Sequence, residues 1–288
     1  MLKSSAKMRI ASSPVAFQVE DVDYLRVEGR TFQARVYRPE GPGPFPALLD
    51  VHGGQWTIAT STREGQAPVD KALAAMGIVV VAVDFRQDPQ HHYPDSIVDV
   101  NFALRWLRAN AARFEASPRM MGALGSSSGG HLVMLNAMRP DDPRYGALPL
   151  AGVPAEAARP DYIITCCPIL DPIDRRGFAA RTGREDILRA TATYFSPPET
   201  IEDANPKLIL DRGEPVKLPP TLLIQGTADK NVDHTSQDRF ADAYRAAGGE
   251  LQLEKLQDAP HQFATMPGPY ADRAYALMKD FISRQLAA

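Results

Sequence analysis

Hydrophobic residues follow two patterns that alternate along the chain. Short apolar runs of strand length are separated by stretches in which apolar residues recur every three or four positions. Continuous apolar runs are typical of strands that are buried on both faces of a parallel sheet. The predicted strands are Ala47–Val51, Ile78–Val83, Met120–Leu124, Tyr162–Cys167, Thr221–Gln225 and Glu250–Leu256.

The clearest helical pattern lies over residues 97–114. Apolar side chains fall there at spacings of three and four, which places them along one face of a helix. Asp95 and Ser96 offer side-chain oxygens that can cap its first turn. The other predicted helices are Val69–Met76, His131–Met138, Arg184–Tyr194, Ser236–Ala247 and Tyr270–Leu286.

The order of these elements predicts the fold class. Val22–Val27 and Thr31–Tyr37 alternate in polarity around a short turn and predict a hairpin. After it, strands and helices alternate to the C-terminus, which favours an α/β protein with a mostly parallel, twisted sheet and helices on both faces. We find no repeat or linker, so we expect one domain over residues 1–288.

Residues 171–218 interrupt the alternation. This segment contains several prolines, one predicted helix and no strand. We expect a short cap-like insertion over one end of the sheet. Because ligands of such sheets bind beyond the carboxyl ends of the strands, the insertion is expected to cover the binding site.

Composition narrows the classes of function. The chain has 288 residues, of which 44% are apolar and 23% charged, as in globular proteins. Its 32 basic and 35 acidic residues nearly balance, so no basic field attracts nucleic acid or anionic lipid. The longest apolar run, residues 77–83, is far shorter than the roughly 20 residues of a membrane-spanning helix. Small molecules are therefore the expected partners.

Several further expectations follow from missing signals. Met1–Ile10 has basic residues but no apolar segment after them, so we expect no secretory signal and a cytoplasmic protein.

Cys166 and Cys167 are adjacent, and because a disulfide between neighbours is strained, we expect two buried thiols. No metal-binding motif is found, so we expect neither a metal nor a cofactor. A homodimer is kept as an alternative to a monomer.

The segment Gly125–Gly129 matches the pattern G-x-S-x-G and lies between a predicted strand and a predicted helix. A sharp strand-to-helix turn holds its central residue in strained geometry, and the flanking glycines remove side chains that would collide. Only Ser127 has glycine two residues away on both sides. We therefore predict that Ser127 is a nucleophile.

A second glycine motif, His52-Gly53-Gly54-Gln55-Trp56, follows the strand Ala47–Val51. Glycines allow main-chain N–H groups to approach a developing negative oxygen closely. This motif therefore predicts donors of an oxyanion hole.

A serine nucleophile needs a base and an acid that orients it, in the chain order serine, acid, histidine for this architecture. Asp229 lies in the turn after the strand Thr221–Gln225, and we favour it over Asp233, which is farther from the strand end. His261 lies in a loop before the last helix and is the expected base.

Together, HGGQW, DFRQDPQHHYPDSIVDVNFALRWL, GSSSGG, GTAD and DAPHQF resemble the hormone-sensitive-lipase-like esterases of the α/β-hydrolase superfamily. The resemblance covers roughly residues 36–286. It implies an α/β-hydrolase fold with Ser127, Asp229 and His261 as the triad. It also implies oxyanion donors from the main chain of the stretch Gly53, Gly54 and Gln55 and from Ser128.

The chain departs from that family pattern at Gln55, where a third glycine is usual. We expect the Gln55 amide and the Trp56 ring to narrow the substrate pocket, so that short or planar acyl groups are preferred. HGG-x-W is also similar to the motif of kynurenine formamidases.

Three readings remain open at this point. The first is a serine carboxylesterase for small or aromatic esters. The second is an arylformamidase or another amide or carbamate hydrolase that uses the same residues. The third is a binding protein on a hydrolase scaffold, which the intact set of serine, acid and histidine disfavours.

Overall fold

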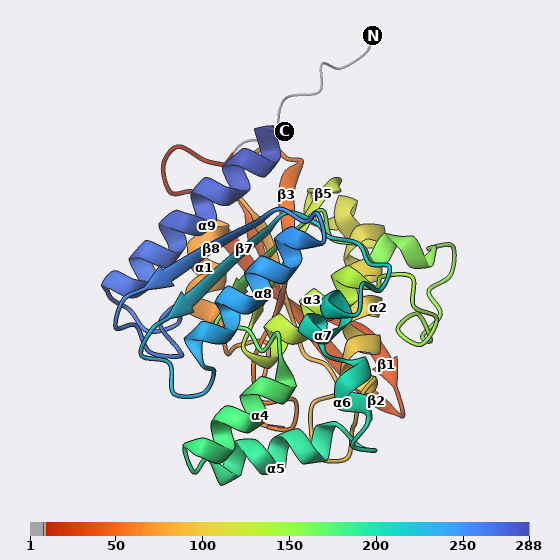
Figure 1. The fold of residues 1–288 in the computed structure, drawn as a ribbon. Coiled ribbons are helices and arrows are strands. Elements are labelled where there is room, and N and C mark those ends of the chain that lie inside the picture. Colours follow the sequence, from red (N-terminus) through yellow and green to blue (C-terminus); the bar gives the residue numbers. More distant parts are fainter. Residues whose placement is uncertain (1–7, 9, 288) are drawn as a thin grey trace.

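A computed structural model describes residue 8 and residues 10–287 as one eight-stranded sheet covered by helices (Figure 1). Most of Met1–Ile10, where we expect no secretory signal, lies outside the described residues. The strands are β1 Phe17–Val27, β2 Arg30–Pro39, β3 Phe45–Val51, β4 Val79–Val83, β5 Ala116–Ser126, β6 Tyr162–Cys166, β7 Thr221–Gly226 and β8 Leu251–Leu256. Their order across the sheet is β1-β2-β4-β3-β5-β6-β7-β8.

The sheet is antiparallel at one edge and parallel elsewhere. The predicted hairpin is confirmed, since β1 pairs antiparallel with β2, and β2 pairs antiparallel with β4. All pairs from β4 through β3 to β8 are parallel. The predicted fold class, a mostly parallel α/β sheet, is confirmed.

Helices cover both faces of the sheet, and each face has its own apolar core. The longer helices are α1 Ala67–Ala75, α2 Asp95–Asn110, α3 Ser128–Met138, α8 His234–Ala246 and α9 Pro269–Ala287. Helices α2, α3 and α8 pack with Ala47 and Leu49 of β3 on one face. Helices α1 and α9 pack with Leu48 on the other face. Successive side chains of β3 therefore enter opposite cores, which explains the unbroken apolar runs in the sequence.

The predicted insertion forms a small helical cap. It contains α4 Pro172–Arg181, α5 Glu185–Tyr194, α6 Thr200–Asp203 and α7 Pro206–Asp211, and its described residues contain no strand. In Figure 1, α4 and α5 lie at the lower end of the molecule, beyond the ends of the strands. Of these four helices, only α5 is predicted from the sequence, as the helix Arg184–Tyr194. Helix α4 begins with the side chain of Asp171 accepting from the N–H of Asp174, a capping signal that apolar spacing does not detect.

Several predicted boundaries differ from the structure, and β1 and β5 begin five and four residues before the predicted Val22 and Met120. The predicted helix over 97–114 ends as an α-helix at Asn110 and continues as a short 3-10 helix, η1 Ala111–Phe114. The predicted strand Tyr162–Cys167 ends at Cys166, because Cys167 has a φ of 43°, which breaks the extended backbone. That residues 1–288 form a single domain stays a prediction. No helix among the described residues combines the length and apolar character needed to cross a membrane.

Candidate active site

Ser127 lies in the sharp turn between β5 and α3. Its φ of 53° and ψ of −120° are unusual for a residue with a side chain and show strained backbone geometry. The Ser127 N–H donates to the main-chain oxygen of Cys166 at 3.0 Å, which ties the turn to the end of β6. The side chain is mostly buried, with 8% exposed, yet Ser127 lines a cavity of about 500 Å³.

The flanking glycines permit close packing of the turn. A side chain on Gly125 would place its Cβ 2.5 Å from the main-chain oxygen of Gly129. A side chain on Gly129 would place its Cβ 2.0 Å from the oxygen of Val51. Both distances are too short for real atoms, so the two glycines allow α3 to start directly against β3 and β5.

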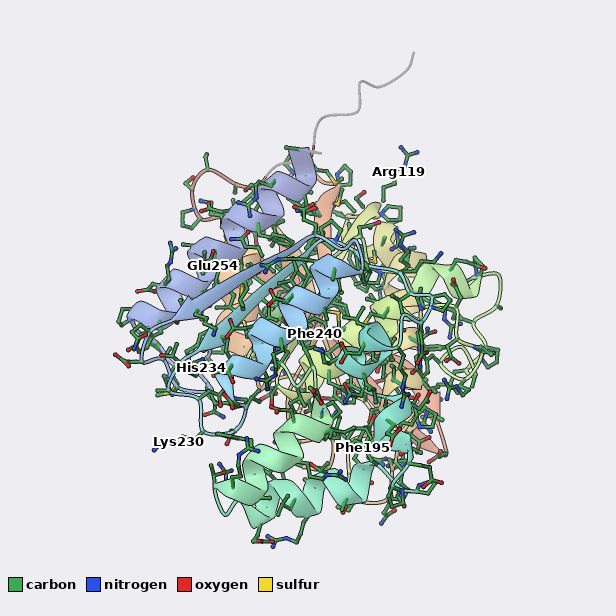
Figure 2. The ribbon with its side chains drawn as sticks, in the orientation of Figure 1. Arg119, Phe195, Lys230, His234, Phe240 and Glu254 are labelled. Carbon is green, nitrogen blue, oxygen red and sulfur yellow. The ribbon has the colours of Figure 1, made fainter. Side chains whose placement is uncertain are left out.

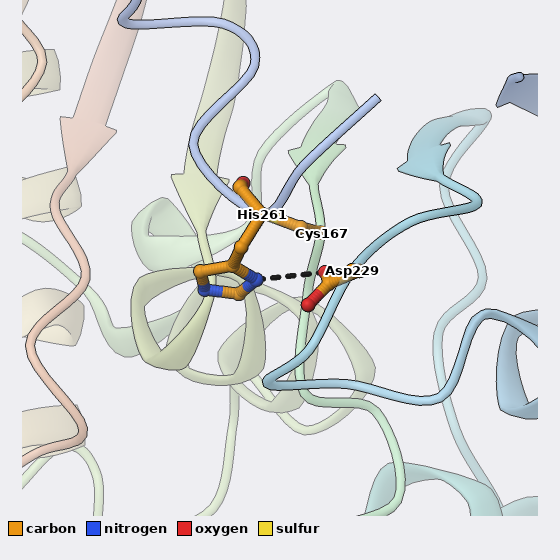
Figure 3. A group of neighbouring side chains, drawn as sticks. All are labelled: Cys167, Asp229 and His261. Carbon is orange, nitrogen blue, oxygen red and sulfur yellow. Dashed lines mark hydrogen bonds and ion pairs between the residues drawn. The ribbon is translucent and has the colours of Figure 1, made fainter. Parts of the chain in front are cut away.

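The structure brings Ser127, His261 and Asp229 into one hydrogen-bonded chain. His261 Nε2 lies 3.0 Å from Ser127 Oγ, and His261 Nδ1 lies 2.7 Å from Asp229 Oδ2. Figure 3 shows the imidazole ring directed toward the Asp229 carboxylate, with Cys167 beside it. The three side chains come from loops after β5, β7 and β8, whose carboxyl ends lie at the same edge of the sheet.

The environment of Asp229 favours its ionised form. Asp229 Oδ1 accepts the N–H groups of Asn231 and Val232, at 2.7 and 3.0 Å, and Oδ2 accepts Gln225 Nε2 at 2.9 Å. Burial opposes ionisation, but the hydrogen bonds, with His261 contributing most, hold the pKa of Asp229 below its usual range. This carboxylate is suited to orient an imidazole and to stabilise its protonated form.

Asp233, the alternative candidate for the acid, has a different structural role. Its side chain accepts the Thr235 N–H at 3.0 Å and caps the first turn of α8. The structure therefore pairs His261 with Asp229 and uses Asp233 as a helix cap.

The segment after β3 forms a loop of unusual backbone conformation beside Ser127. Gly54 and Gln55 have φ values of 134° and 53°. A Cβ at Gly54 would lie 2.2 Å from Gln87 Nε2, so only glycine fits. The same Gln87 amide donates to the oxygens of Gly53 and Ile58, at 3.3 and 3.1 Å, and fixes the loop.

The loop after β3 and the start of α3 both carry main-chain N–H groups without acceptors, and the loop approaches Ser127 closely at Gly53. A Cβ on Gly53 would lie 3.1 Å from Ser127 Cβ, which shows how closely the two segments approach. Within the described part of the chain, the N–H groups of Gly53, Gly54, Gln55 and Ser128 have no hydrogen-bond acceptor. Such free N–H groups are available to bind a negative oxygen.

The prediction that Trp56 lines the substrate pocket is wrong. Its ring is completely buried and lies behind the pocket wall. The ring stacks on Tyr194 at 5.1 Å and 6°, and Trp56 Nε1 donates to His131 Nδ1 at 3.1 Å. Phe195, labelled in Figure 2, packs edge-on against the same ring at 5.1 Å. Trp56 turns inward because its φ of 63° reverses the loop after Gln55, and it joins the loop to the cap.

Gln55, by contrast, does face the cavity. This cavity has a volume of about 500 Å³ and is lined by the loop over residues 52–66, the Ser127 turn, the loop over residues 261–265 and Arg175 of the cap. The Gln55 side-chain oxygen is buried, and no donor among the described residues reaches it.

One group of side chains in the described residues has the geometry of a metal site. Cys167, Asp229 and His261 place their ligand atoms within 4.8 Å of one another. Both His261 ring nitrogens and the Asp229 carboxylate are already hydrogen-bonded, and burial raises the pKa of the Cys167 thiol well above its usual range. A protonated thiol is a poor ligand, so this group fits a hydrogen-bonded triad better than a metal centre. As expected, both Cys166 and Cys167 are free and buried.

A match to a known protein family shows which family the chain belongs to. The BD-FAE family matches residues 35–244, which is well over half of the chain. The chain belongs to the BD-FAE family. The matched region contains Ser127 and Asp229, and His261 lies just beyond it.

Individual relatives of this BD-FAE member carry esterase names. Esterase LipC of Mycobacterium tuberculosis is 30% identical over 78% of this chain and 55% of its own length. Ethyl acetate hydrolase of Pseudomonas putida is 25% identical over 86% of this chain and 76% of its own length. The chain thus spans about half the length of LipC.

Solved structures show the same fold. The apo form of Thermogutta terrifontis esterase 2 superimposes with a TM-score of 0.75 at 22% identity, over 92% of this chain and 94% of the other. The BD-FAE member therefore has the α/β-hydrolase fold that the sequence motifs imply.

Some residues of the site were missed by sequence reasoning. Gln87 holds the loop after β3, Gln225 and Asn231 hold Asp229, and Arg175 reaches the cavity from the cap. Gln225 and Asn231 are within four positions of Asp229, so their closeness is a usable signal. Nothing local in the sequence marks Gln87 or Arg175.

Proposed function

We propose that the protein is a serine carboxylesterase that acts through an acyl-enzyme. The observation that carries this proposal is the hydrogen-bonded chain from Ser127 Oγ through His261 to Asp229, with distances of 3.0 and 2.7 Å. These distances are those expected of a nucleophile with its general base and orienting acid.

The reaction would proceed in two halves. Ser127 Oγ attacks the ester carbonyl carbon while His261 Nε2 accepts the hydroxyl proton. His261 then donates this proton to the leaving alcohol, and the acyl group stays on Ser127. Water, deprotonated by His261, releases the acid and restores the serine. Asp229 stays ionised throughout and stabilises the protonated imidazole.

The main-chain N–H groups of Gly53, Gly54, Gln55 and Ser128 would stabilise the tetrahedral intermediate. Their lack of acceptors in the described part of the chain supports this role. Each such donor typically lowers the barrier by about 3 kcal/mol. Because the donors belong to the main chain, Gln55 can serve as well as glycine.

A short-chain substrate suits the cavity. Its volume of about 500 Å³ is in the range of small-molecule sites, and Gln55 is one of the residues that line it. The relationship to an enzyme named ethyl acetate hydrolase agrees with a small ester. A monomer or a homodimer is compatible with the proposal.

The decisive test is the variant Ser127→Ala. We expect kcat for p-nitrophenyl acetate to fall by about a million-fold, as for other nucleophile losses, with an unchanged melting temperature. A fluorophosphonate probe should label Ser127 in the wild-type protein only. Ser126→Ala is the matched control, because Ser126 bonds to the Gln66 side chain and not to His261. A larger loss in Ser126→Ala than in Ser127→Ala would reject the assignment.

The alternative of an arylformamidase rests on the HGGQW motif. It uses the same three residues, so only substrates can separate the two activities. Acetate esters, N-formyl anilides and carbamates of the same phenol or aniline should be compared by kcat/KM. We expect the ester to be preferred, and preference for the formyl anilide would favour the alternative.

A further inference from the structure

Arg175 is a buried cation at the wall of the active-site cavity. It lies on α4 of the cap, is only 1% exposed and is one of the residues that line the cavity. Its Nε donates to the main-chain oxygen of Asn231 at 3.2 Å. Its Nη1 and Nη2 atoms are buried, and no acceptor among the described residues reaches them.

The charge of Arg175 persists in this position. Burial lowers the pKa of Arg175 to about 10, so the guanidinium is still protonated at neutral pH. The face of Trp56 lies 5.6 Å from its Cζ and offers a cation–π contact. The Trp56 ring compensates only part of the free-energy cost of removing the Arg175 guanidinium from water. The four N–H donors on Nη1 and Nη2 remain without a hydrogen-bond acceptor among the described residues.

The carboxylates near the cavity are committed to other partners. Glu64, the acidic residue of the cavity lining, pairs with Arg35 at 3.0 Å. Asp229 is hydrogen-bonded to His261 and to the turn that follows it. Among the described residues that line the cavity, Arg175 alone carries a permanent positive charge. The cavity lining that holds the candidate nucleophile thus also holds a cation whose two Nη groups have no hydrogen-bond acceptor among the described residues.

We propose that Arg175 binds a carboxylate on the substrate, so that the preferred ester is a short one with an anionic group, such as a monoester of a dicarboxylic acid. The two Nη groups match the two oxygens of a carboxylate in a forked pair. Ser127 and Arg175 line the same cavity, so one small molecule can present its ester to the first and its carboxylate to the second. This inference rests on the proposed esterase function.

The test compares anionic esters with neutral ones of similar size. On the acyl side, mono-p-nitrophenyl glutarate is paired with p-nitrophenyl pentanoate. On the alcohol side, 4-butyryloxybenzoate is paired with its methyl ester. The measured quantity is the ratio of kcat/KM, anionic over neutral. We expect at least one ratio to fall by about 10- to 100-fold in Arg175→Gln, mainly through KM, and to recover partly in Arg175→Lys.

Arg184→Gln is the matched control. Arg184 also contacts the turn after Asp229, through Asn231 Oδ1 at 2.7 Å, but it pairs with Asp186 and does not line the cavity. If Arg175 only supports that turn, both variants lower the rates of anionic and neutral esters alike and the ratios stay constant. Constant ratios in Arg175→Gln would overturn the proposal.

A binding measurement keeps this inference separate from the esterase proposal. Calorimetry with glutarate should show binding to the wild-type protein and to Ser127→Ala, and at least ten-fold weaker binding to Arg175→Gln. If no ester is hydrolysed but glutarate binding depends on Arg175, the esterase proposal fails and the anion site stands. If neutral esters are hydrolysed but glutarate binds wild type and Arg175→Gln equally, the esterase stands and the anion site fails.

Discussion

At the scale of single residues, the site depends on backbone conformations that most side chains avoid. Ser127, Gln55 and Cys167 all have φ between 43° and 53°, and all three line the cavity. Strained residues persist only where the surrounding structure holds them, and such residues concentrate at functional sites. Here the hydrogen bonds of the Ser127 and Cys167 N–H groups to β6 and β7 hold the two turns in place.

The pH profile should show a single acid limb. The rate should rise once with pH, because a general-base imidazole accepts the serine proton only in its neutral form. Although burial opposes it, hydrogen bonding holds the pKa of Asp229 below its usual range, so Asp229 adds no second limb above about pH 4. The measurement is kcat/KM between pH 5 and 9, and a flat profile would exclude a histidine base. Asp229→Asn should lower kcat by about 10⁴-fold.

Gln55→Gly should broaden the acyl preference. The left-handed φ of 53° suits glycine, and removing the buried amide enlarges the cavity while keeping the main-chain donor. In the wild type we expect rates to fall beyond about four to six acyl carbons, because a filled pocket gains nothing from further methylenes. The variant should hydrolyse octanoyl esters better and acetyl esters about equally. Loss of acetyl turnover in a folded variant would contradict this role of Gln55.

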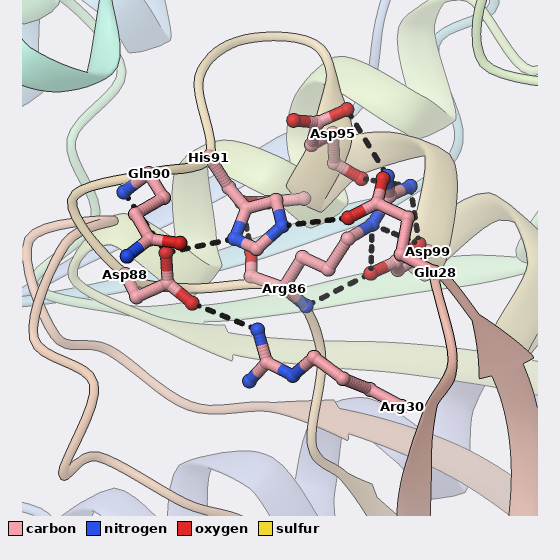
Figure 4. Close-up of polar contacts among 9 residues, drawn as sticks. Glu28, Arg30, Arg86, Asp88, Gln90, His91, Asp95 and Asp99 are labelled. Carbon is pink, nitrogen blue, oxygen red and sulfur yellow. Dashed lines mark hydrogen bonds and ion pairs between the residues drawn. The ribbon is translucent and has the colours of Figure 1, made fainter.

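At the scale of elements, charged side chains fix the segment between β4 and α2. Figure 4 shows Arg86, just after β4, reaching Asp99 and Asp95 of α2 and Glu28 of the hairpin turn. The Arg86–Asp99 pair lies at 2.8 Å, with the Asp99 side chain completely buried. Gln87, the next residue, holds the loop after β3, so this network positions part of the candidate site.

Asp99→Ala should therefore be costly. It leaves the buried Arg86 guanidinium without its main partner, and such losses typically lower the free energy of unfolding by about 3–5 kcal/mol. Asp23→Ala is the control, because the Asp23–Arg26 pair is exposed and 3.8 Å apart. Urea unfolding should show a change within about 1 kcal/mol for that variant. Equal effects of the two substitutions would show that burial does not determine the strength of the Arg86 network.

At the scale of the whole molecule, a buried pair of acids makes stability depend on pH. Asp70 of α1 and Asp50 of β3 are buried on the same side of the sheet. Burial and the neighbouring Asp50 raise the pKa of Asp70 well above its usual range. Because the folded pKa exceeds the unfolded one, its stabilising contribution is complete below about pH 4 and falls as the pH rises, by up to about 1.4 kcal/mol per unit.

Asp70→Asn should remove much of this dependence. The neutral amide has no proton to lose, so the variant should gain stability relative to wild type between pH 5 and 8. The measurement is urea unfolding at several pH values. Asp242→Asn is the control, since the Asp242 side chain is 81% exposed and should leave the slope unchanged. A parallel pH dependence in wild type and Asp70→Asn would show that Asp70 is ionised in the folded protein.

The sequence by itself determined the strands, the order of the elements and the residues of the serine, acid and histidine chain. These features depend on local chemistry: apolar runs, helical spacing and a glycine-flanked turn each act over a few neighbouring residues. Parallel strands then bring their carboxyl ends to one edge, so Ser127, Asp229 and His261 meet although they are far apart in the chain.

Only the tertiary structure decided which residues surround the hydrogen-bonded Ser127, His261 and Asp229. Trp56 follows Gln55 directly, yet one faces the cap core and the other the cavity, because the backbone reverses between them. Arg175 reaches the cavity through the packing of α4, which local apolar spacing did not detect. Such contacts depend on how helices and loops distant in sequence pack together. A local pattern therefore specifies which residues have the required chemistry, and long-range packing specifies which of them face the substrate.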